Sequence, residues 1–347
     1  MATTIWGASS SWTLTALPLF VWMGEILFRT KLSENLFEGL SPWMQKLPGG
    51  LVHVNVVGCA LFAAISGSSA ATVATVGKMS IPELRKRKYP ESILLGSLAG
   101  SGTLGLLIPP SIILIIYGVT VQESIAKLFI AGILPGIMIA LIFMTYVIIW
   151  SSINKKLMPV SKQNFSFTEK FRKSGKLIPV ILLILSVIGS IYTGVATATE
   201  AASLGVVGAL ILSYFQKSLT LKTFKASLLG ATKTSCMIAF ILAGATFLSL
   251  AMGFTGLPRN LAIWIESMDL SPYVLIFVLM IFYIILGMFL DGISAVVLTM
   301  AIIEPMIRQA GFDMIWFGIF LVIVVEMAQI TPPVGFNLFV LHEAQKD

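Results

Sequence analysis

Long apolar segments dominate this 347-residue chain and restrict the folds open to it. A helix needs about 20 apolar residues to cross the ~30 Å hydrocarbon core of a bilayer. Because lipid offers no hydrogen-bond partners to the backbone, continuously apolar segments of this length predict helices. Eight segments reach or approach the spanning length: 12–28, 51–77, 92–118, 128–150, 177–193, 234–254, 273–303 and 315–341. A further, shorter helix is expected over 200–215.

The composition agrees with a membrane protein. Hydrophobic residues make up 57% of the chain and charged residues 11%, whereas a soluble domain carries about 25% charged residues. We therefore expect an all-α integral membrane protein in a lipid bilayer. The net charge of +7 is interpreted as a marker of topology, so no nucleic acid is expected as a partner. Cys59 and Cys236 lie in apolar segments, which favours two small buried side chains without a disulfide.

Short motifs occur twice along the chain in the same order. The matching pairs are 31–36 with 256–261, 66–70 with 291–295, and Pro109-Pro110 with Pro332-Pro333. The first two pairs share an offset of 225 residues. We therefore expect two copies of one unit, at 1–118 and 234–347, joined by connecting helices and basic loops at 119–233. A duplicated, helix-breaking membrane unit is typical of secondary transporters.

Positive charge gathers in three connecting stretches, which the positive-inside rule assigns to the cytoplasm. These stretches are 78–91, 151–176 and 216–233. Counting the membrane crossings between them predicts that the second unit is inverted relative to the first. Inverted repeats normally bind substrate and ions near the bilayer midplane, where broken helices of the two copies meet.

Small polar residues interrupt one apolar segment of each unit. Segment 51–77 begins and ends beside cytoplasmic charge, so it must turn partway along its length. It is interpreted as a re-entrant helical hairpin with its tip at Ser66–Ser69. The twin hairpin is expected over 273–306, with its tip at Asp291–Ser294.

Paired prolines interrupt the next segment of each unit. Proline removes an amide donor and clashes with the preceding turn. Segment 92–118 should therefore break near Gly105–Ile108, and its counterpart near Gln329–Thr331. The fold class predicted is thus an inverted repeat with two re-entrant hairpins and two broken transmembrane helices.

The hairpin tips and breaks predict a binding site, because a break at membrane depth is tolerated where it lines a polar cavity. Freed carbonyls and nearby hydroxyls are hard oxygen ligands of the kind that Na⁺ prefers, and amides at half-helix starts suit an anion. The hydroxyls concerned belong to Ser66, Ser68, Thr103 and Thr331. The sequence contains no HExxH or GxSxG motif, so an enzyme is not expected.

Short motifs are spread over nearly the whole chain, and their combination is specific enough to indicate a family. The motifs are Pro48–Leu51 with Asn55, Ile65–Ala70, Ile81–Leu84, Leu104–Ser111, Ile116–Gly118, Thr199–Ala201 and Thr331–Gly335. Together they resemble the large membrane subunit of tripartite ATP-independent periplasmic (TRAP) transporters. The resemblance implies an elevator-type carrier, similar to others of the ion-transporter superfamily. Such a carrier takes up a small organic anion across the bacterial inner membrane, using the Na⁺ gradient.

The resemblance also implies partners and a substrate class. The partners would be a small four-helix membrane subunit and a periplasmic substrate-binding protein. The substrate would be a C4-dicarboxylate, sialic acid or a related sugar or keto acid. Na⁺ is implied as the coupling ion, and no other cofactor is implied.

Two Na⁺ sites and a substrate site follow from the same resemblance. The first Na⁺ site is carried over to Ser66, Gly67, Ser68, Ser69, Gly105 and Pro109. The second is carried over to Asp291, Gly292, Ser294, Ala328, Thr331 and Pro332. Substrate contacts are carried over to Ser69, Thr103, Thr199, Glu200 and Asn337. Ala328 stands where a glycine is common in the family, and its methyl group restricts the unwound backbone there.

Several of these patterns also have a structural interpretation. Thr197 and Glu200 fit a capping box at a helix start, beside a role near substrate. Glu25 and Arg29 fit an ion pair at a helix end. Gly100–Gly105 fits GxGxxG, but no strand precedes it, so close helix packing or lining of the cavity is favoured over nucleotide binding.

Buried polar residues are open to similar alternatives. Asp291 and Glu326 lie inside apolar segments, where a carboxylate is costly and usually faces a cavity. Asn55 is expected to make an interhelical hydrogen bond. His53 and His342 are expected at the membrane boundaries, without a metal.

Two other functions remain open from the sequence. Paired hairpins also occur in stand-alone dicarboxylate or oxyanion carriers of the wider superfamily, which need no partner. Family members usually have further helices before Trp12 and after the last segment, so a truncated, nonfunctional remnant is the second alternative.

Overall fold

The described part of the chain is built from helices and contains no strand. The computed structural model describes residues 6, 10, 12–30, 32–159, 165–267 and 271–345, so Lys31 and Lys162 of the expected motifs lie outside it. The all-α prediction is confirmed. The first ten elements are η1 (Trp12–Thr15), α2 (Ala16–Phe28), α3 (Leu32–Met44), α4 (Val52–Ser66), α5 (Ser69–Lys86), α6 (Glu91–Gly102), α7 (Leu104–Leu107), α8 (Ile112–Thr120), α9 (Ile125–Ile153) and η2 (Lys155–Leu157).

The remaining elements continue the pattern of apolar helices joined by short connections. They are α10 (Phe167–Ser174), α11 (Ile178–Tyr192), α12 (Ala198–Phe215), α13 (Leu221–Thr255), α14 (Leu257–Ser267), α15 (Pro272–Gly287), α16 (Gly292–Gln309), α17 (Met314–Gln329) and α18 (Phe336–Ala344). Five helical spans of the described chain are long and apolar enough to cross a membrane, and the bent pair α10–α11 makes a sixth. The five are α6–α8, α9, α12, α13 and α16.

These spans differ in how deeply they are buried in the protein. In the most apolar 18 residues of the broken span α6–α8, 89% are buried, whereas the figures for α9 and α13 are 22% and 17%. The broken span therefore forms the core of the molecule. The apolar faces of α9 and α13 point outward, where lipid or another chain can cover them.

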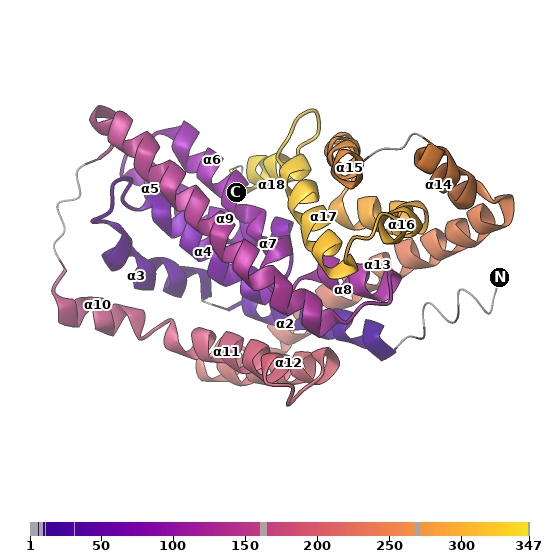
Figure 1. Ribbon diagram of the computed structural model, residues 1–347. Helices are drawn as coiled ribbons and strands as arrows, with labels where there is room; N and C mark the ends of the chain where they lie inside the picture. The colour runs from indigo at the N-terminus through magenta and orange to yellow at the C-terminus, as the bar shows by residue number, and fades with distance from the viewer. Residues whose placement is uncertain are drawn as a thin grey trace.

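The helices fall into two groups that lie side by side in Figure 1. In one group α2 packs against α12 and α13, and α11 packs on α12. In the other, α4 to α9 form the body, and α15 to α18 join it through contacts of α18 with α5, of α16 with α8, and of α17 with α7, α8 and α9. Segments far apart in sequence are thereby brought to one centre.

The first predicted hairpin turns at the expected tip, but its second helix runs to Lys86 and not to residue 77. Helices α4 and α5 pack against each other and are separated only by Gly67 and Ser68. The second pair is interrupted at 288–291, slightly before the expected tip. Asp291 is the N-cap of α16, and Gly292 and Ser294 lie in its first turn.

Both predicted helix breaks are present at the paired prolines. Helix α7 ends at Leu107, within the expected Gly105–Ile108, and α17 ends at Gln329. The residues before the prolines leave the helical conformation because proline disfavours it in its predecessor, as the extended Ile108 illustrates. A further interruption at Thr103 separates α6 from α7 and was not expected.

Two helices extend into stretches that were expected to be loops. The basic stretch 78–91 is helical as far as Lys86, because Ile81 and Leu84 bury one face of α5 against the core. In the stretch 216–233, α13 begins at Leu221 with Thr220 as its N-cap, and Ser227 and Ala231 are buried at helical spacing. The basic residues therefore did not mark the ends of these two helices.

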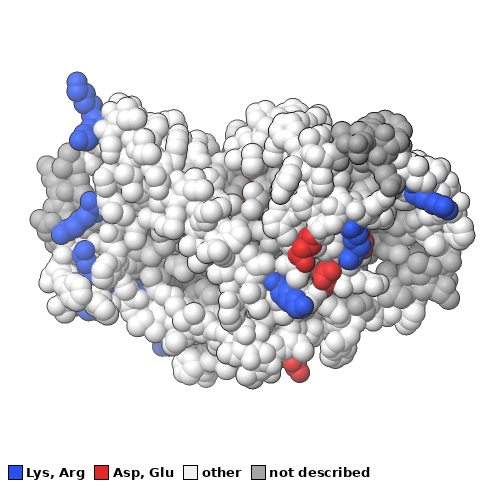
Figure 2. Space-filling model, viewed as in Figure 1, with Lys and Arg blue, Asp and Glu red and all other residues white. Residues whose placement is uncertain are grey.

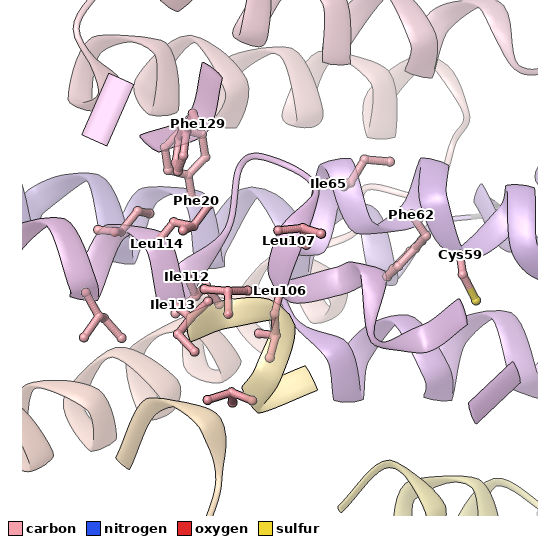
Figure 3. Close-up of a cluster of buried hydrophobic side chains, with 14 of the residues drawn as sticks. Phe20, Cys59, Phe62, Ile65, Leu106, Leu107, Ile112, Ile113, Leu114 and Phe129 are labelled. Carbon is pink, nitrogen blue, oxygen red and sulfur yellow. The ribbon is translucent and has the colours of Figure 1, made fainter. Parts of the chain in front are cut away.

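A dense apolar core lies beneath the first hairpin tip and the first break (Figure 3). It draws buried side chains from α2, α4, α7, α8 and α9. The rings of Phe20 and Phe129 meet edge to face with centroids 5.9 Å apart. This packing fixes α7 and α8 relative to α4, so the tip and the break share one rigid base.

Single residues refine the sequence interpretation. Asn55 donates a hydrogen bond to Ser97 Oγ across α4 and α6 at 2.9 Å, as expected. The ring of His53 is buried in the protein, with Nε2 2.7 Å from the carbonyl oxygen of Pro48, and its position at a membrane boundary stays a prediction. Cys59 is buried but Cys236 is exposed, contrary to expectation, and both thiols are free.

Charged side chains occupy little of the molecular surface. Figure 2 shows a face that is mostly neither acidic nor basic, with Lys and Arg gathered mainly toward its ends and one mixed cluster nearer the middle. Arg85 and Glu91, 2.7 Å apart, form one of the exposed ion pairs. Such a surface suits an apolar environment.

A buried tyrosine ties the first repeated unit to the second and provides a test of the fold. The hydroxyl of Tyr117 on α8 donates to the carbonyl oxygen of Met314 on α17 at 2.7 Å. Tyr117→Phe removes this hydrogen bond, although the carbonyl at the start of α17 keeps its helical donor, so we expect the free energy of unfolding to fall by about 0.5–1.5 kcal/mol. Thermal unfolding in detergent measures this. Tyr146→Phe, at a residue that is 58% exposed, should change nothing, and equal behaviour of the two variants would contradict the assignment.

Candidate functional site

The tip of the first hairpin is a compact network of hydroxyl groups. Ser66 Oγ lies 2.9 Å from Thr72 Oγ1 and donates to the carbonyl oxygen of Ser68 at 3.2 Å. Thr72 Oγ1 donates to the same carbonyl at 2.7 Å. Ser68 caps α5 by accepting from the amide of Ala71. A hydroxyl has one donor and two lone pairs, so these oxygens keep lone pairs free for a cation.

Glycine allows the tip to touch the first break. Gly67 ends α4 with φ +59°, and its carbonyl accepts from the amide of Ile112 at 3.2 Å. A Cβ at Gly67 would lie 2.6 Å from the carbonyl oxygen of Pro110. Gly105 packs on the other side of the tip, where a Cβ would lie 2.5 Å from the carbonyl oxygen of Ser68. Tip and break are therefore in backbone contact.

The first break supplies further oxygen atoms. The hydroxyl of Thr103 is buried and donates to the carbonyl of Gly100 at 2.7 Å. Ser111 Oγ donates to the carbonyl of Leu106 across the break. Pro109 and Pro110 carry no amide proton, so carbonyls upstream of them lose their usual helical donors. The residues predicted for the first Na⁺ site, Ser66 to Ser69, Gly105 and Pro109, thus lie on two segments that meet.

In the second unit the tip residues mainly cap a helix. Asp291 accepts from the amides of Ile293 and Ser294 at 3.1 and 3.2 Å. Gly292 faces the end of α17, where a Cβ would lie 2.7 Å from Gln329 Nε2. The carboxylate of Asp291 thus has a structural role at the start of α16, beside any role in ion binding.

The second break opens after α17. Thr331 Oγ1 donates to the carbonyl of Met327 at 2.7 Å, and Pro332 is exposed. Ala328 is buried, and its methyl group packs against Gly287 on α15, where a Cβ would lie 2.6 Å away. Because glycine has no side chain, Gly287 leaves space for the methyl group of Ala328.

A buried hydrogen bond between two side chains also joins the two units. Ser69 Oγ donates to Asn337 Oδ1 at 2.8 Å, and both residues are buried. Asn337 Nδ2 has no hydrogen-bond partner among the described residues. Ser69 and Asn337 were both predicted for the substrate site and are neighbours, although they are 268 positions apart. The Nδ2 amide group of Asn337 remains available as a donor.

Thr199 and Glu200 lie elsewhere. They begin α12, which packs against α2 and α11. Glu200 completes the capping box by accepting from the amide and hydroxyl of Thr197, both at 2.8 Å. None of the hydrogen bonds seen in the described chain links either residue to the hairpin tips, so the capping interpretation accounts for Glu200.

A cavity of about 370 Å³ adjoins the first hairpin tip. It lies between α2 and α13 on one side and the tip, α8 and α18 on the other. Its walls are Val21, Gly24, Glu25, Phe28, Ser66, Ser68, Ala70, Ala71, Ala74, Ile112, Thr234 and Val340. The predicted ion pair of Glu25 with Arg29 is confirmed at 2.8 Å.

The sequence analysis missed several cavity residues. Gly24 brings α2 to the tip, because a Cβ there would lie 3.2 Å from Ser66 Cα. Thr234 lines the cavity from α13, and Thr72 completes the hydroxyl network. A lone glycine within an apolar helix was the available signal for Gly24, whereas nothing local distinguished Thr234 or Thr72 from other helical threonines.

The oxygen donors limit the metal that such a site suits. No cluster of three or more His, Cys, Asp or Glu side chains in the described ranges could hold a metal ion. Hydroxyl and carbonyl oxygens favour hard cations over transition metals. The site residues therefore fit an alkali cation.

Contact between Gly105 and the tip can be tested. Gly105→Ala places a methyl group against the Ser68 carbonyl, so we expect overpacking to cost about 1–3 kcal/mol of unfolding free energy. Gly96→Ala is the matched control, because nothing lies within 4 Å of a Cβ there. Thermal unfolding of the two variants should diverge, and an unchanged Gly105→Ala protein would show that tip and break do not touch.

Comparison with known proteins places these features in a family. A family model described as the DctM component of the tripartite ATP-independent periplasmic transporter matches residues 1–345. The C4-dicarboxylate TRAP transporter large permease protein DctM of Pseudomonas aeruginosa is 33% identical over 341 residues, covering 98% of this chain and 79% of that protein. The isethionate TRAP transporter permease protein DctMQ of Oleidesulfovibrio alaskensis is 32% identical over 334 residues, covering 95% of this chain and 52% of that protein.

A solved structure shares the fold. The YdaH transporter of Alcanivorax borkumensis superposes with a TM-score of 0.62 at 14% identity, covering 99% of this chain and 81% of that chain. At this identity the likeness concerns the fold alone. The match to the family model over nearly the whole length, with relatives above 30% identity, shows that this chain belongs to the DctM family of TRAP transporter large permeases.

Proposed function

We propose that this chain carries a small organic anion across the bacterial inner membrane, driven by a Na⁺ gradient, as the large subunit of a TRAP transporter. The observation that carries the proposal is the backbone contact between the hydroxyl-rich tip of the first hairpin and the first helix break. A cation at this contact would be held by both segments. Its binding would therefore order the wall of the adjoining cavity.

The directions of the hydrogen bonds at the first hairpin tip support the first proposed Na⁺ site. The hydroxyl of Ser66 donates its proton to the Ser68 carbonyl and accepts from the Ser68 amide, which leaves one lone pair for a cation. Ser68 and the carbonyls freed before Pro109 extend the oxygen set. The equivalent second site would use Thr331 and carbonyls at the end of α17, where the Thr331 hydroxyl likewise donates to the backbone.

The substrate site is proposed at the 370 Å³ cavity. Cavities of about 300–1,000 Å³ hold small molecules, which suits a C4-dicarboxylate or a sugar acid. The amino end of α5 begins at the cavity wall, at Ser68 and Ser69, and its free amides and dipole favour an anion. Asn337 does not line the cavity, but it is bonded to Ser69, the residue next to Ser68 of the wall, and its amide donor has no partner among the described residues.

Transport is proposed to occur by alternating access. The two hairpins and two broken helices would move as one body against α2, α11, α12 and α13, carrying the substrate and Na⁺. The cavity supports this division because it lies between the two groups, and small side chains such as Ala70, Ala71 and Ala74 line it. The proposal includes an inverted arrangement of the two units with re-entrant hairpins.

Two partners complete the proposed system. A small four-helix membrane subunit would cover part of the outward apolar surface that α9 and α13 expose. The DctMQ relative, roughly half of which matches this chain, supports such a partner. A periplasmic binding protein would deliver the substrate, as the family description of a tripartite periplasmic transporter suggests.

Stabilisation by Na⁺ provides the first test. A ligand that binds only the folded state raises stability by about 2.7 kcal/mol at 100 times its Kd. We expect the detergent-purified chain to unfold at a higher temperature in Na⁺ than in K⁺ at equal ionic strength. Ser66→Ala and Thr331→Ala should each weaken this rise, because each removes an oxygen ligand.

Matched controls separate ion binding from helix stability. Thr246→Ala removes the same kind of bond to the preceding turn as Thr331→Ala, at 2.8 Å to Leu242. Ser213→Ala does so on buried α12. Both controls should keep the full Na⁺ response. Equal unfolding temperatures of the unmodified chain in Na⁺ and K⁺ would contradict the proposed sites.

Transport itself is the decisive measurement. The chain would be reconstituted in liposomes with its neighbouring membrane subunit and binding protein, and uptake of labelled succinate and sialic acid followed. We expect uptake only with an inward Na⁺ gradient. Uptake that persists when K⁺ replaces Na⁺ would refute Na⁺ coupling, and uptake by this chain alone would favour a stand-alone carrier.

A further inference from the structure

Glu25 on α2 is the one charged side chain among the described residues that line the 370 Å³ cavity. The other residues of its wall are apolar, small or hydroxyl-bearing. The side chain of Glu25 is 27% exposed. A carboxylate accepts hydrogen bonds but donates none. An anion bound at the amino end of α5 would therefore share the cavity with a group of its own charge.

Contacts on two sides hold the carboxylate of Glu25 between α2 and α13. Arg29 Nη2, one turn further along α2, donates to its Oε2 at 2.8 Å. On α13 the carboxylate packs over Gly230, where a Cβ would lie 2.6 Å from Oε2 and 3.1 Å from Oε1. Thr234, one turn after Gly230 on the same side of α13, also lines the cavity. The carboxylate is therefore part of the wall that α2 and α13 form.

One oxygen of this carboxylate is available to a ligand. Oε2 accepts from Arg29, whereas no hydrogen bond within the described chain ends on Oε1. An ionised carboxylate has about four lone-pair sites, so Glu25 can accept from a further donor. Its backbone lies close to the hairpin tip, because a Cβ at the preceding Gly24 would be 3.2 Å from Ser66 Cα. A small molecule can therefore reach both sides of the cavity.

The cavity offers no basic side chain to a second carboxylate. No Lys, Arg or His is among the described residues of its wall. Arg29 does not line it, and its guanidinium is already paired with Glu25. A dianion with one carboxylate at the amino end of α5 would find only apolar side chains, hydroxyls and Glu25 for its other carboxylate. Like charges repel, and neither carboxylate can donate to the other.

We propose that Glu25 is a specificity-determining residue that selects acids with one carboxylate and with hydroxyl or ammonium groups at the other end. The single carboxylate binds at the amino end of α5, and a hydroxyl or ammonium group donates to Glu25. A dicarboxylate is disfavoured because its second carboxylate brings no donor. This inference rests on the proposed function and narrows its substrate class to monocarboxylates such as sugar acids. Such selection is a difference between two affinities.

Two pairs of acids test this selection, L-threonate with L-tartrate and D-gluconate with D-glucarate. The members of a pair share one carbon chain, but the second has a carboxylate where the first has a hydroxymethyl group. Binding to the detergent-purified chain is measured at neutral pH and saturating Na⁺, from the acid concentration at the midpoint of the rise in unfolding temperature. We expect each monocarboxylate to bind about tenfold more tightly than its dicarboxylate, as one hydrogen bond to a charged group would cause.

Substitutions of Glu25 separate its charge from its shape. Glu25→Gln keeps the size and supplies an amide donor, so the preference should disappear, chiefly through tighter binding of tartrate and glucarate. Glu25→Asp keeps the charge and should retain the preference. The matched control is Glu304→Gln on α16, which breaks a similar pair with Arg308, at 2.9 Å and one turn apart, away from the cavity. It should bind all the acids as the unmodified chain does.

Three results would overturn the inference. Tartrate or glucarate that binds the unmodified chain as tightly as its monocarboxylate partner would do so, while leaving the proposed transport in place. An unchanged preference in Glu25→Gln would show that Glu25 has a structural role alone. If Na⁺ stabilises the unmodified chain but none of the acids does, the cavity is not the substrate site, and that part of the proposed function fails as well. The first and third results need no variant to fold.

Discussion

The structure depends on one constraint, which is that backbone N–H and C=O groups need hydrogen-bond partners where helices break inside an apolar core. Unpaired amides and carbonyls are costly away from water, and the chain is interrupted at its centre at both hairpin tips and at both proline pairs. At each break a specific partner compensates: Ser68 and Asp291 cap the following helices. Ser111 bridges the first proline pair, and Thr331 bonds back to α17. The same groups that stabilise the breaks are the oxygen-rich surface that a hard cation needs.

The second organising principle is contact between the two halves at these breaks. Ser69 and Asn337 share a hydrogen bond, Tyr117 donates to the carbonyl of Met314, and Gly292 adjoins Ile113. Each contact joins residues from different units. A change at one break is therefore felt at another without passing through the bilayer-facing helices. This arrangement suits a body that binds its ligands together and moves as a whole.

Local chemistry made the breaks predictable from sequence. The paired prolines located both helix ends, and Gly67 between serines located the first tip, because each residue type excludes a continuing helix. Helix ends near Lys86 and Leu221 were missed, since buried faces continued the helices past the basic residues. The burial of His53 and the pairing of Ser69 with Asn337 depend on tertiary contacts that no local pattern encodes. Whether Na⁺ occupies these positions rests on experiment.

The backbone contact between Gly67, Gly105 and the tip has a consequence for how such carriers diversify. A Cβ at Gly67 or at Gly105 would lie within 2.6 Å of a carbonyl oxygen. A substitution at either glycine would therefore separate the hairpin tip from the helix break. The opposite wall of the 370 Å³ cavity is instead lined by side chains, among them those of Val21 and Phe28 on α2 and of Thr234 on α13. A change of side-chain size at these three positions would therefore alter the cavity and leave the backbone contact between tip and break in place.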